Sequence, residues 1–130
     1  MTNSNSFYLG DRLISKDSNP LVIAEVGINH EGDLNKAILM VDKAAEVGCE
    51  CVKFQSHVLD DEMIPNAVIP GNAEESIWDI MARCALSENE ELELKEYVES
   101  KNLIYLCTPF SRAAADRLEK MGVIGYKIGS

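Results

Sequence analysis

CVKFQSH, residues 51–57, alternates apolar and polar side chains. Successive side chains of a β-strand point to opposite faces, so Val52 and Phe54 share one face while Lys53 and Gln55 share the other. The segment therefore predicts a strand that packs one face in a core and carries a cation and an amide on the other. Such a strand is either a half-exposed edge or part of a polar site.

Strand-like and helix-like segments alternate along the rest of the chain. We expect strands at residues 21–28, 51–56, 103–109 and 125–130. We expect helices at residues 34–48, 73–85, 91–101 and 111–122. The residues expected to begin or end these helices are Asp33, Gly48, Asn72 with Glu75, Ser87 with Glu90, Ser111 and Gly122. Residues 57–72 have little periodicity and are expected to form a surface loop.

This alternation favours an α/β fold with a parallel sheet covered by helices. Residues 17–130 are expected to form the N-terminal half of a (β/α)8 barrel, with about four parallel strands, because a complete barrel needs about 250 residues. The chain ends on an apolar strand, so we expect it to be truncated before the barrel closes. Residues 1–16 form an N-terminal extension or a hairpin over 7–14. A small doubly wound sheet is the alternative, but the turn GINHEGD lacks the GxGxxG pattern.

The composition excludes several classes of partner. The chain has 130 residues, of which 46% are hydrophobic and 26% charged, as in a soluble globular protein. A net charge of -10 disfavours nucleic acid and anionic membranes, which attract clustered Lys and Arg. The N-terminal residues lack the pattern of a signal peptide, and no apolar run is long enough to span a membrane. We expect a cytoplasmic protein.

Polar residues recur late in the predicted strands, where barrel enzymes carry their chemistry. They are Glu25, Lys53, Gln55, Thr108, Lys127 and Ser130. A single strand lysine is more often at a sheet edge, and a single threonine is often only a good β-former, but four strands cannot all be edges. Lys127 and Ser130 have opposite parity, so one must reach inward from the strand end or a bulge must intervene.

The chemistry of this set is that of an anion site. Two lysines and two hydroxyls can neutralise phosphate and carboxylate, and Glu25 can act as a base, a proton shuttle or an orienter of a substrate hydroxyl. His30 and His57 also follow predicted strands. Two isolated histidines are a weak metal signal, and structural or substrate contacts are the favoured interpretation.

Several motifs resemble the N-terminal half of bacterial N-acetylneuraminate (sialic acid) synthases, from about Pro20 to Ser130. The matching segments are IAEVGINHEGDLNKA, VKFQSH, IPGNAEESIWDIMARCALSENEE, YLCTPFSRAAADRL and GYKIGS. Legionaminate, pseudaminate and related nonulosonate synthases share most of them. The resemblance implies a (β/α)8 barrel followed by an antifreeze-like domain, assembled as a domain-swapped homodimer.

The resemblance also implies a reaction and the roles of residues. Members of this family condense phosphoenolpyruvate with N-acetylmannosamine or a related amino sugar and release phosphate. By motif, Glu25 resembles the central carboxylate, and Gln55 resembles a contact to the amino sugar. The residues that resemble the phosphoenolpyruvate site are Lys53, Thr108, Lys127 and Ser130.

The rest of the family's site is expected outside this chain. The family uses Mn²⁺ or Mg²⁺, whose two histidine ligands lie beyond residue 130, so the chain is expected to hold no metal ligand and to be inactive alone. The first alternative is a synthase for a legionaminate-type or pseudaminate-type product. The second is a non-catalytic half-barrel that associates with itself through its exposed sheet edges.

Overall fold

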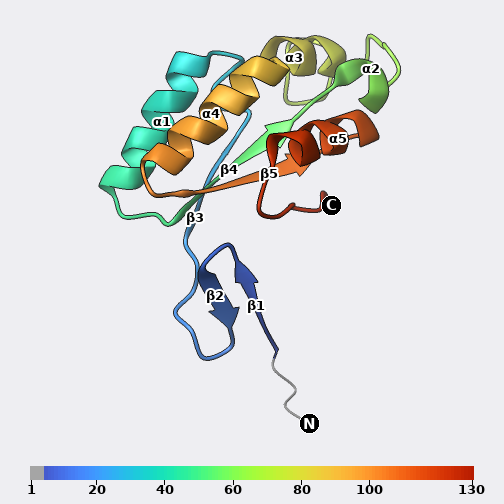
Figure 1. Ribbon diagram of the computed structural model, residues 1–130. Helices are drawn as coiled ribbons and strands as arrows, with labels where there is room; N and C mark the ends of the chain where they lie inside the picture. Colours follow the sequence, from blue (N-terminus) through green and yellow to red (C-terminus); the bar gives the residue numbers. More distant parts are fainter. Residues whose placement is uncertain (1–4) are drawn as a thin grey trace.

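The chain forms an α/β fold around a parallel sheet. The computed structural model describes residues 5–130, and Figure 1 shows the arrangement of its elements. The sheet has the order β3-β4-β5 and consists of β3 (Ile23–Gly27), β4 (Cys51–Ser56) and β5 (Ile104–Pro109). The larger helices are α1 (Leu34–Glu46), α3 (Ile77–Cys84), α4 (Glu88–Ser100) and α5 (Arg112–Met121). The alternation of strands and helices that the sequence predicts is confirmed.

One face of the sheet packs against helices, and the core lies between them. Val52 and Phe54 of β4 are buried with Val41 of α1, Leu94 of α4 and Leu118 of α5. Figure 1 shows α1 and α4 side by side over this face, with α5 beside β5. The opposite parity leaves Lys53 and Gln55 on the other face, as the alternation predicts.

Most of the predicted helix ends are confirmed. The Asp33 carboxylate accepts hydrogen bonds from two backbone N–H groups at the start of α1. Ser87 and Glu90 form a capping box at α4, which satisfies two N–H groups that have no partner within the helix. Ser111 caps α5, and Gly122 ends it with a left-handed backbone, at φ 71°.

The prediction that Asn72 caps the third helix is wrong. α3 begins at Ile77, and its cap is Ser76, whose hydroxyl oxygen accepts from the Asp79 N–H at 3.1 Å. Serine and asparagine are both good caps, so the local pattern does not distinguish the two positions. The predicted loop also contains a single helical turn, α2 (Leu59–Glu62).

The predicted fourth strand at 125–130 does not form within the described residues. The sheet has three strands, and this segment makes one backbone hydrogen bond to it, from the Lys127 N–H to the Cys107 carbonyl at 3.2 Å. A ladder needs successive bonds of this kind, and Ile128 remains 80% exposed. The resemblance to a barrel therefore rests here on three parallel strands.

A hairpin precedes the sheet, as predicted for residues 7–14. It pairs β1 (Ser6–Leu9) with β2 (Arg12–Ser15), whereas residues 1–4 of the predicted extension lie outside the described residues. The Arg12 Nε atom lies 2.8 Å from the Glu50 carboxylate just before β4, which holds the hairpin near the amino ends of the parallel strands (Figure 1). Among the described helices, none has the length and apolar character needed to cross a membrane.

Candidate active site

Glu25 and Lys53 lie at the centre of the polar face of the sheet. They are direct partners in the parallel register of β3 and β4, and the Lys53 ammonium pairs with a Glu25 carboxylate oxygen. The Lys53 side chain is 17% exposed, whereas that of Glu25 is 48% exposed. The ammonium is therefore partly shielded, whereas its carboxylate partner is open to solvent.

Gly27 brings Gln55 against this pair. The register of β3 shifts between Glu25 and Gly27, and Gly27 has φ +58°, a conformation that favours glycine. A Cβ at this position would lie 3.2 Å from Glu25 Oε1 and 3.3 Å from Gln55 Nε2. The carboxylate and the amide therefore flank the same glycine, and the structure joins Glu25, Lys53 and Gln55 in one cluster.

We expect Gly27→Ala to destabilise the protein and disturb this cluster. The left-handed backbone costs a residue with a Cβ about 1–2 kcal/mol, and the two polar side chains must also move. The free energy of unfolding in urea measures the loss. Gly71→Ala is the matched control, because an added Cβ there meets nothing within 4 Å. Equal stability of the two variants would contradict the argument.

The other predicted site residues lie farther along the sheet. Thr108 is the register partner of Gln55 and is 3% exposed, with its methyl group 3.5 Å from a Cβ placed on Gly129. Lys127 lies in the segment that runs beside β5, and Ser130 is exposed at its end. Within residues 5–130, no side-chain hydrogen bond or ion pair joins Lys127 or Ser130 to the cluster. Their roles in binding remain predictions.

His57 is a contributor that the sequence reasoning did not assign to the site. The residue is 5% exposed, and its ring bridges two polar groups, with Nδ1 2.7 Å from Glu62 Oε2 and Nε2 2.9 Å from Gln55 Oε1. The ring also stacks on Phe110, with centroids 4.6 Å apart. His57 follows Gln55 by two residues, so strand parity could have indicated that they share a face. Nothing in the sequence pointed to Glu62, because the helical turn α2 was not foreseen.

A buried ionic group supports β4 from the helix side. The Ser56 hydroxyl lies 2.9 Å from both carboxylate oxygens of Glu91, and Arg117 Nη1 lies 3.0 Å from one of them. Glu91 is 2% exposed, and burial raises its pKa while Arg117 and Ser56 oppose that rise. This group joins β4, α4 and α5 directly behind the polar end of the strand.

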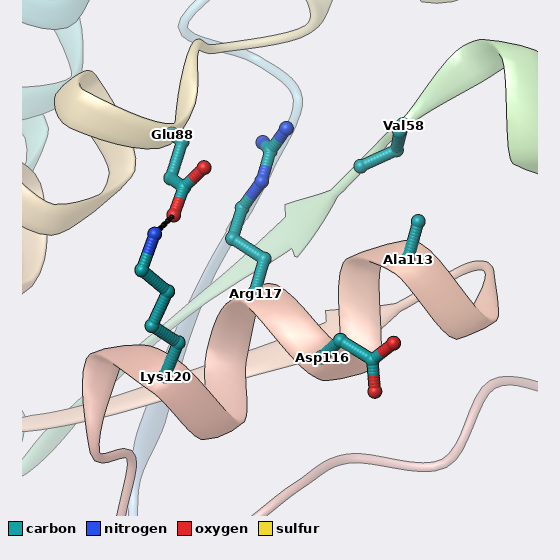
Figure 2. A pocket seen from close by; sticks show the side chains of 6 residues that line it. All are labelled: Val58, Glu88, Ala113, Asp116, Arg117 and Lys120. Atoms are coloured by element: carbon teal, nitrogen blue, oxygen red, sulfur yellow. Dashed lines mark hydrogen bonds and ion pairs between the residues drawn. The ribbon is translucent and has the colours of Figure 1, made fainter.

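A cavity of about 390 Å³ opens beside this group, between α5 and the beginning of α4. Figure 2 shows Lys120 extending from α5 to Glu88, and the two form an ion pair at 2.7 Å. Arg117 also lines the cavity but is paired with Glu91. Both cations that line this cavity therefore already have carboxylate partners.

His30 is buried behind the strands and is the second histidine that the sequence singled out. It is 1% exposed, and its Nδ1 accepts a hydrogen bond from the Gly32 N–H at 3.0 Å, while Nε2 has no hydrogen-bond partner among residues 5–130. Burial is the largest cause that lowers the pKa of His30, followed by the charges of His57 and Lys36. The ring is therefore a structural group that resists protonation.

This lowered pKa predicts a loss of stability in acid. Below about pH 6.5 the unfolded chain binds a proton at His30 that the folded chain resists, so the free energy of unfolding falls as the pH drops towards the folded pKa. His30→Asn keeps an acceptor for Gly32 but does not titrate, so its stability should vary less between pH 7 and 5. Urea unfolding at several pH values measures both proteins, and identical pH slopes would count against the prediction.

A metal site does not fit the described residues. Across residues 5–130, no group of three His, Cys, Asp or Glu side chains gathers closely enough to hold an ion. Both ring nitrogens of His57 are engaged, by Gln55 and Glu62.

A parallel sheet covered by helices, with polar side chains gathered late on neighbouring strands, resembles part of a (β/α)8 barrel, in which the carboxyl ends of the strands carry the active site. Comparison with known families identifies the family to which the chain belongs. Residues 40–130 match the model of the NeuB family, and the chain belongs to this family of sialic acid synthases.

Individual relatives agree with this assignment. The crystal structure of an N-acetylneuraminic acid synthetase from Leptospira borgpetersenii is 31% identical, with a TM-score of 0.81 over 96% of this chain and 41% of that one. An N,N'-diacetyllegionaminic acid synthase from Campylobacter jejuni is 32% identical over 85% of this chain and 35% of its own length. The human N-acetylneuraminate-9-phosphate synthase is 28% identical over 84% and 32%. The chain spans about a third of the length of these curated relatives.

Proposed function

We propose that this chain is part of an enzyme that condenses phosphoenolpyruvate with N-acetylmannosamine to give N-acetylneuraminate and phosphate. The observation that carries the proposal is the cluster of Glu25, Lys53 and Gln55 on neighbouring strands of a NeuB-family fold. In this reaction C3 of phosphoenolpyruvate bonds to the aldehyde carbon of the sugar. Water adds at C2, and phosphate leaves with cleavage of the C–O bond.

Lys53 is proposed to bind the anionic substrate. Its charge is balanced by Glu25 in the structure, so phosphoenolpyruvate must share or replace that carboxylate. The substrate carries more negative charge than one carboxylate and can therefore compete for the ammonium. Thr108, Lys127 and Ser130 are proposed to complete the site, the last two after the segment 125–130 moves into place as a strand.

Glu25 is proposed to act between the two substrates. When the anion engages Lys53, the carboxylate is released from its ion pair and can orient the sugar or move a proton. Gln55 lies beside it and is proposed to bind the amino sugar. This sharing of Lys53 and Glu25 couples the binding of the anion to the availability of the carboxylate.

Other properties of the whole enzyme are proposed on the family's pattern alone. We propose a cytoplasmic homodimer whose barrel continues beyond residues 17–130 and is followed by an antifreeze-like domain. A bound Mn²⁺ or Mg²⁺ would polarise the sugar aldehyde, with ligands supplied by residues outside this chain. Residues 1–130 alone are then inactive.

Turnover by the full-length chain tests this function. Phosphate and nonulosonate release should require phosphoenolpyruvate, a divalent metal and an amino sugar, and residues 1–130 alone should give neither product. N-Acetylmannosamine should be the best acceptor in a panel that includes the precursors of legionaminate and pseudaminate. A preference for one of those precursors would replace the proposed product within the same class, whereas no turnover with any acceptor would refute the class.

A non-catalytic role in self-association is favoured by one observation. Large apolar side chains remain exposed on the hairpin and near the C-terminal end, among them Phe7 at 61%, Tyr8 at 68% and Ile128 at 80%. This role is supported if a protein of residues 1–130 shows no activity in any assay and associates in solution. Light scattering that gives a monomer of 14.4 kDa would contradict it.

A further inference from the structure

In the structure, the two ring nitrogens of His57 each face an oxygen atom. Glu62 Oε2 lies 2.7 Å from Nδ1, and Gln55 Oε1 lies 2.9 Å from Nε2. Stacking on Phe110 and 3% exposure of the side chain prevent the ring from turning to find other partners. The proton positions on this ring therefore follow from what its two neighbours can accept or donate.

Glu62 determines the first of these positions. An ionised carboxylate only accepts hydrogen bonds, so His57 Nδ1 must carry a proton. A neutral imidazole has one N–H, which leaves Nε2 as an acceptor that needs a donor from Gln55. Only an imidazolium donates from both nitrogens, to Glu62 and to the Gln55 oxygen. The charge of His57 and the orientation of the Gln55 amide are therefore coupled.

The two states present opposite groups to the cluster. With charged His57, the Gln55 oxygen is occupied, and the amide nitrogen lies beside Gly27 and Glu25 with N–H groups to donate. With neutral His57, the amide turns over and its carbonyl oxygen takes that place. An acetamido carbonyl only accepts hydrogen bonds, so it can bind the first state but not the second.

We propose that His57 and Glu62 are positioning residues that turn the N–H groups of Gln55 towards the acetamido carbonyl of the sugar. This inference rests on the proposed function. Glu62 Oε2 of α2 lies 2.7 Å from Nδ1 of the ring, and this contact fixes the ring with Nε2 towards Gln55. Phe110, which directly follows β5, stacks on the His57 ring. The charge of His57 is also one of the causes that lower the pKa of His30. The neighbouring Asp61 is bonded to the Ala113 N–H instead.

The kinetics of Glu62→Gln in the full-length enzyme test the positioning role. Gln still accepts from Nδ1 but removes the anion, so the acceptor KM should rise about tenfold, the effect of losing one good hydrogen bond. The KM for phosphoenolpyruvate should stay within about twofold. Asp60→Asn, an exposed position on the same turn, is the matched control and should change neither constant.

A second background shows whether Glu62 acts through Gln55. In Gln55→Ala the amide is absent, so adding Glu62→Gln should leave the acceptor KM unchanged. The same tenfold rise in both backgrounds, or equal rises in the KM values of both substrates, would overturn the proposal.

Labelled NMR separates this inference from the proposed function. In the full-length protein without substrates, Glu62→Gln should shift the ¹⁵N resonances of the His57 ring and of the Gln55 side-chain amide together. This result would stand even if no acceptor supported turnover. A Gln55 amide resonance that stays unchanged while the His57 ring resonance shifts would overturn the coupling, whatever the activity.

Discussion

Glu91→Ala should lower the free energy of unfolding of the full-length protein by about 3–5 kcal/mol. The change leaves the partly buried Arg117 without its carboxylate and the buried Ser56 hydroxyl without its acceptor. Removing one partner of a buried ion pair is costly because the remaining charge stays desolvated and unpaired. Urea unfolding with an intrinsic fluorescence or circular dichroism signal measures the loss.

Two further variants show that the loss comes from the ion pair. Glu93→Ala lies on the same helix but is exposed, and it should change the stability by less than about 0.5 kcal/mol. Glu91→Met combined with Arg117→Met removes both charges and should be more stable than Glu91→Ala alone. A cost below about 1 kcal/mol for Glu91→Ala would show that this ionic group does not support β4.

Lys53→Ala should lower kcat/KM for phosphoenolpyruvate about a thousandfold in the full-length enzyme. Removing Lys53 takes away the cation that pairs with bound phosphoenolpyruvate. Losing one partner of such a desolvated pair costs about 2–5 kcal/mol, and each 1.36 kcal/mol is about tenfold in rate. Lys53 is 17% exposed on the polar face of the sheet, and Glu25 becomes an uncompensated anion when the ammonium is removed. Steady-state kinetics at saturating acceptor measure the change.

The control for Lys53 is a lysine that the site does not use. The Lys43 side chain is 64% exposed on α1 and pairs with Glu46, so Lys43→Ala should leave kcat/KM within about twofold. An unchanged kcat/KM in Lys53→Ala would remove the proposed anion site from this strand.

Local patterns predicted the elements that local physics controls. Alternation at Val52 and Phe54 gave the buried face of β4, because a strand's parity depends only on its own sequence. The caps at Asp33, Ser87 and Ser111 were predictable, since each satisfies N–H groups a few residues away. Asn72 was the exception, because Ser76 offered an equally good cap closer to the apolar turn.

Long-range features could not be predicted in the same way. The contact of Ser56 with Glu91 joins residues 35 positions apart, and no pattern in either segment requires it. The segment 125–130 reads as a strand but does not form one, because strand formation depends on neighbours that supply hydrogen bonds. For the site, parity brought Lys53 and Gln55 together, but the bulge at Gly27 and the contact with Glu62 depend on the folded chain.

The fate of the bridging oxygen in phosphoenolpyruvate tests the proposed reaction most directly. The full-length chain would receive phosphoenolpyruvate labelled with ¹⁸O between C2 and phosphorus, together with N-acetylmannosamine and Mn²⁺. Cleavage of the C–O bond predicts that the released phosphate carries the label, that the nonulosonate does not, and that release requires the sugar. Label retained in the carbon product, or phosphate released at the same rate without the sugar, would contradict the account.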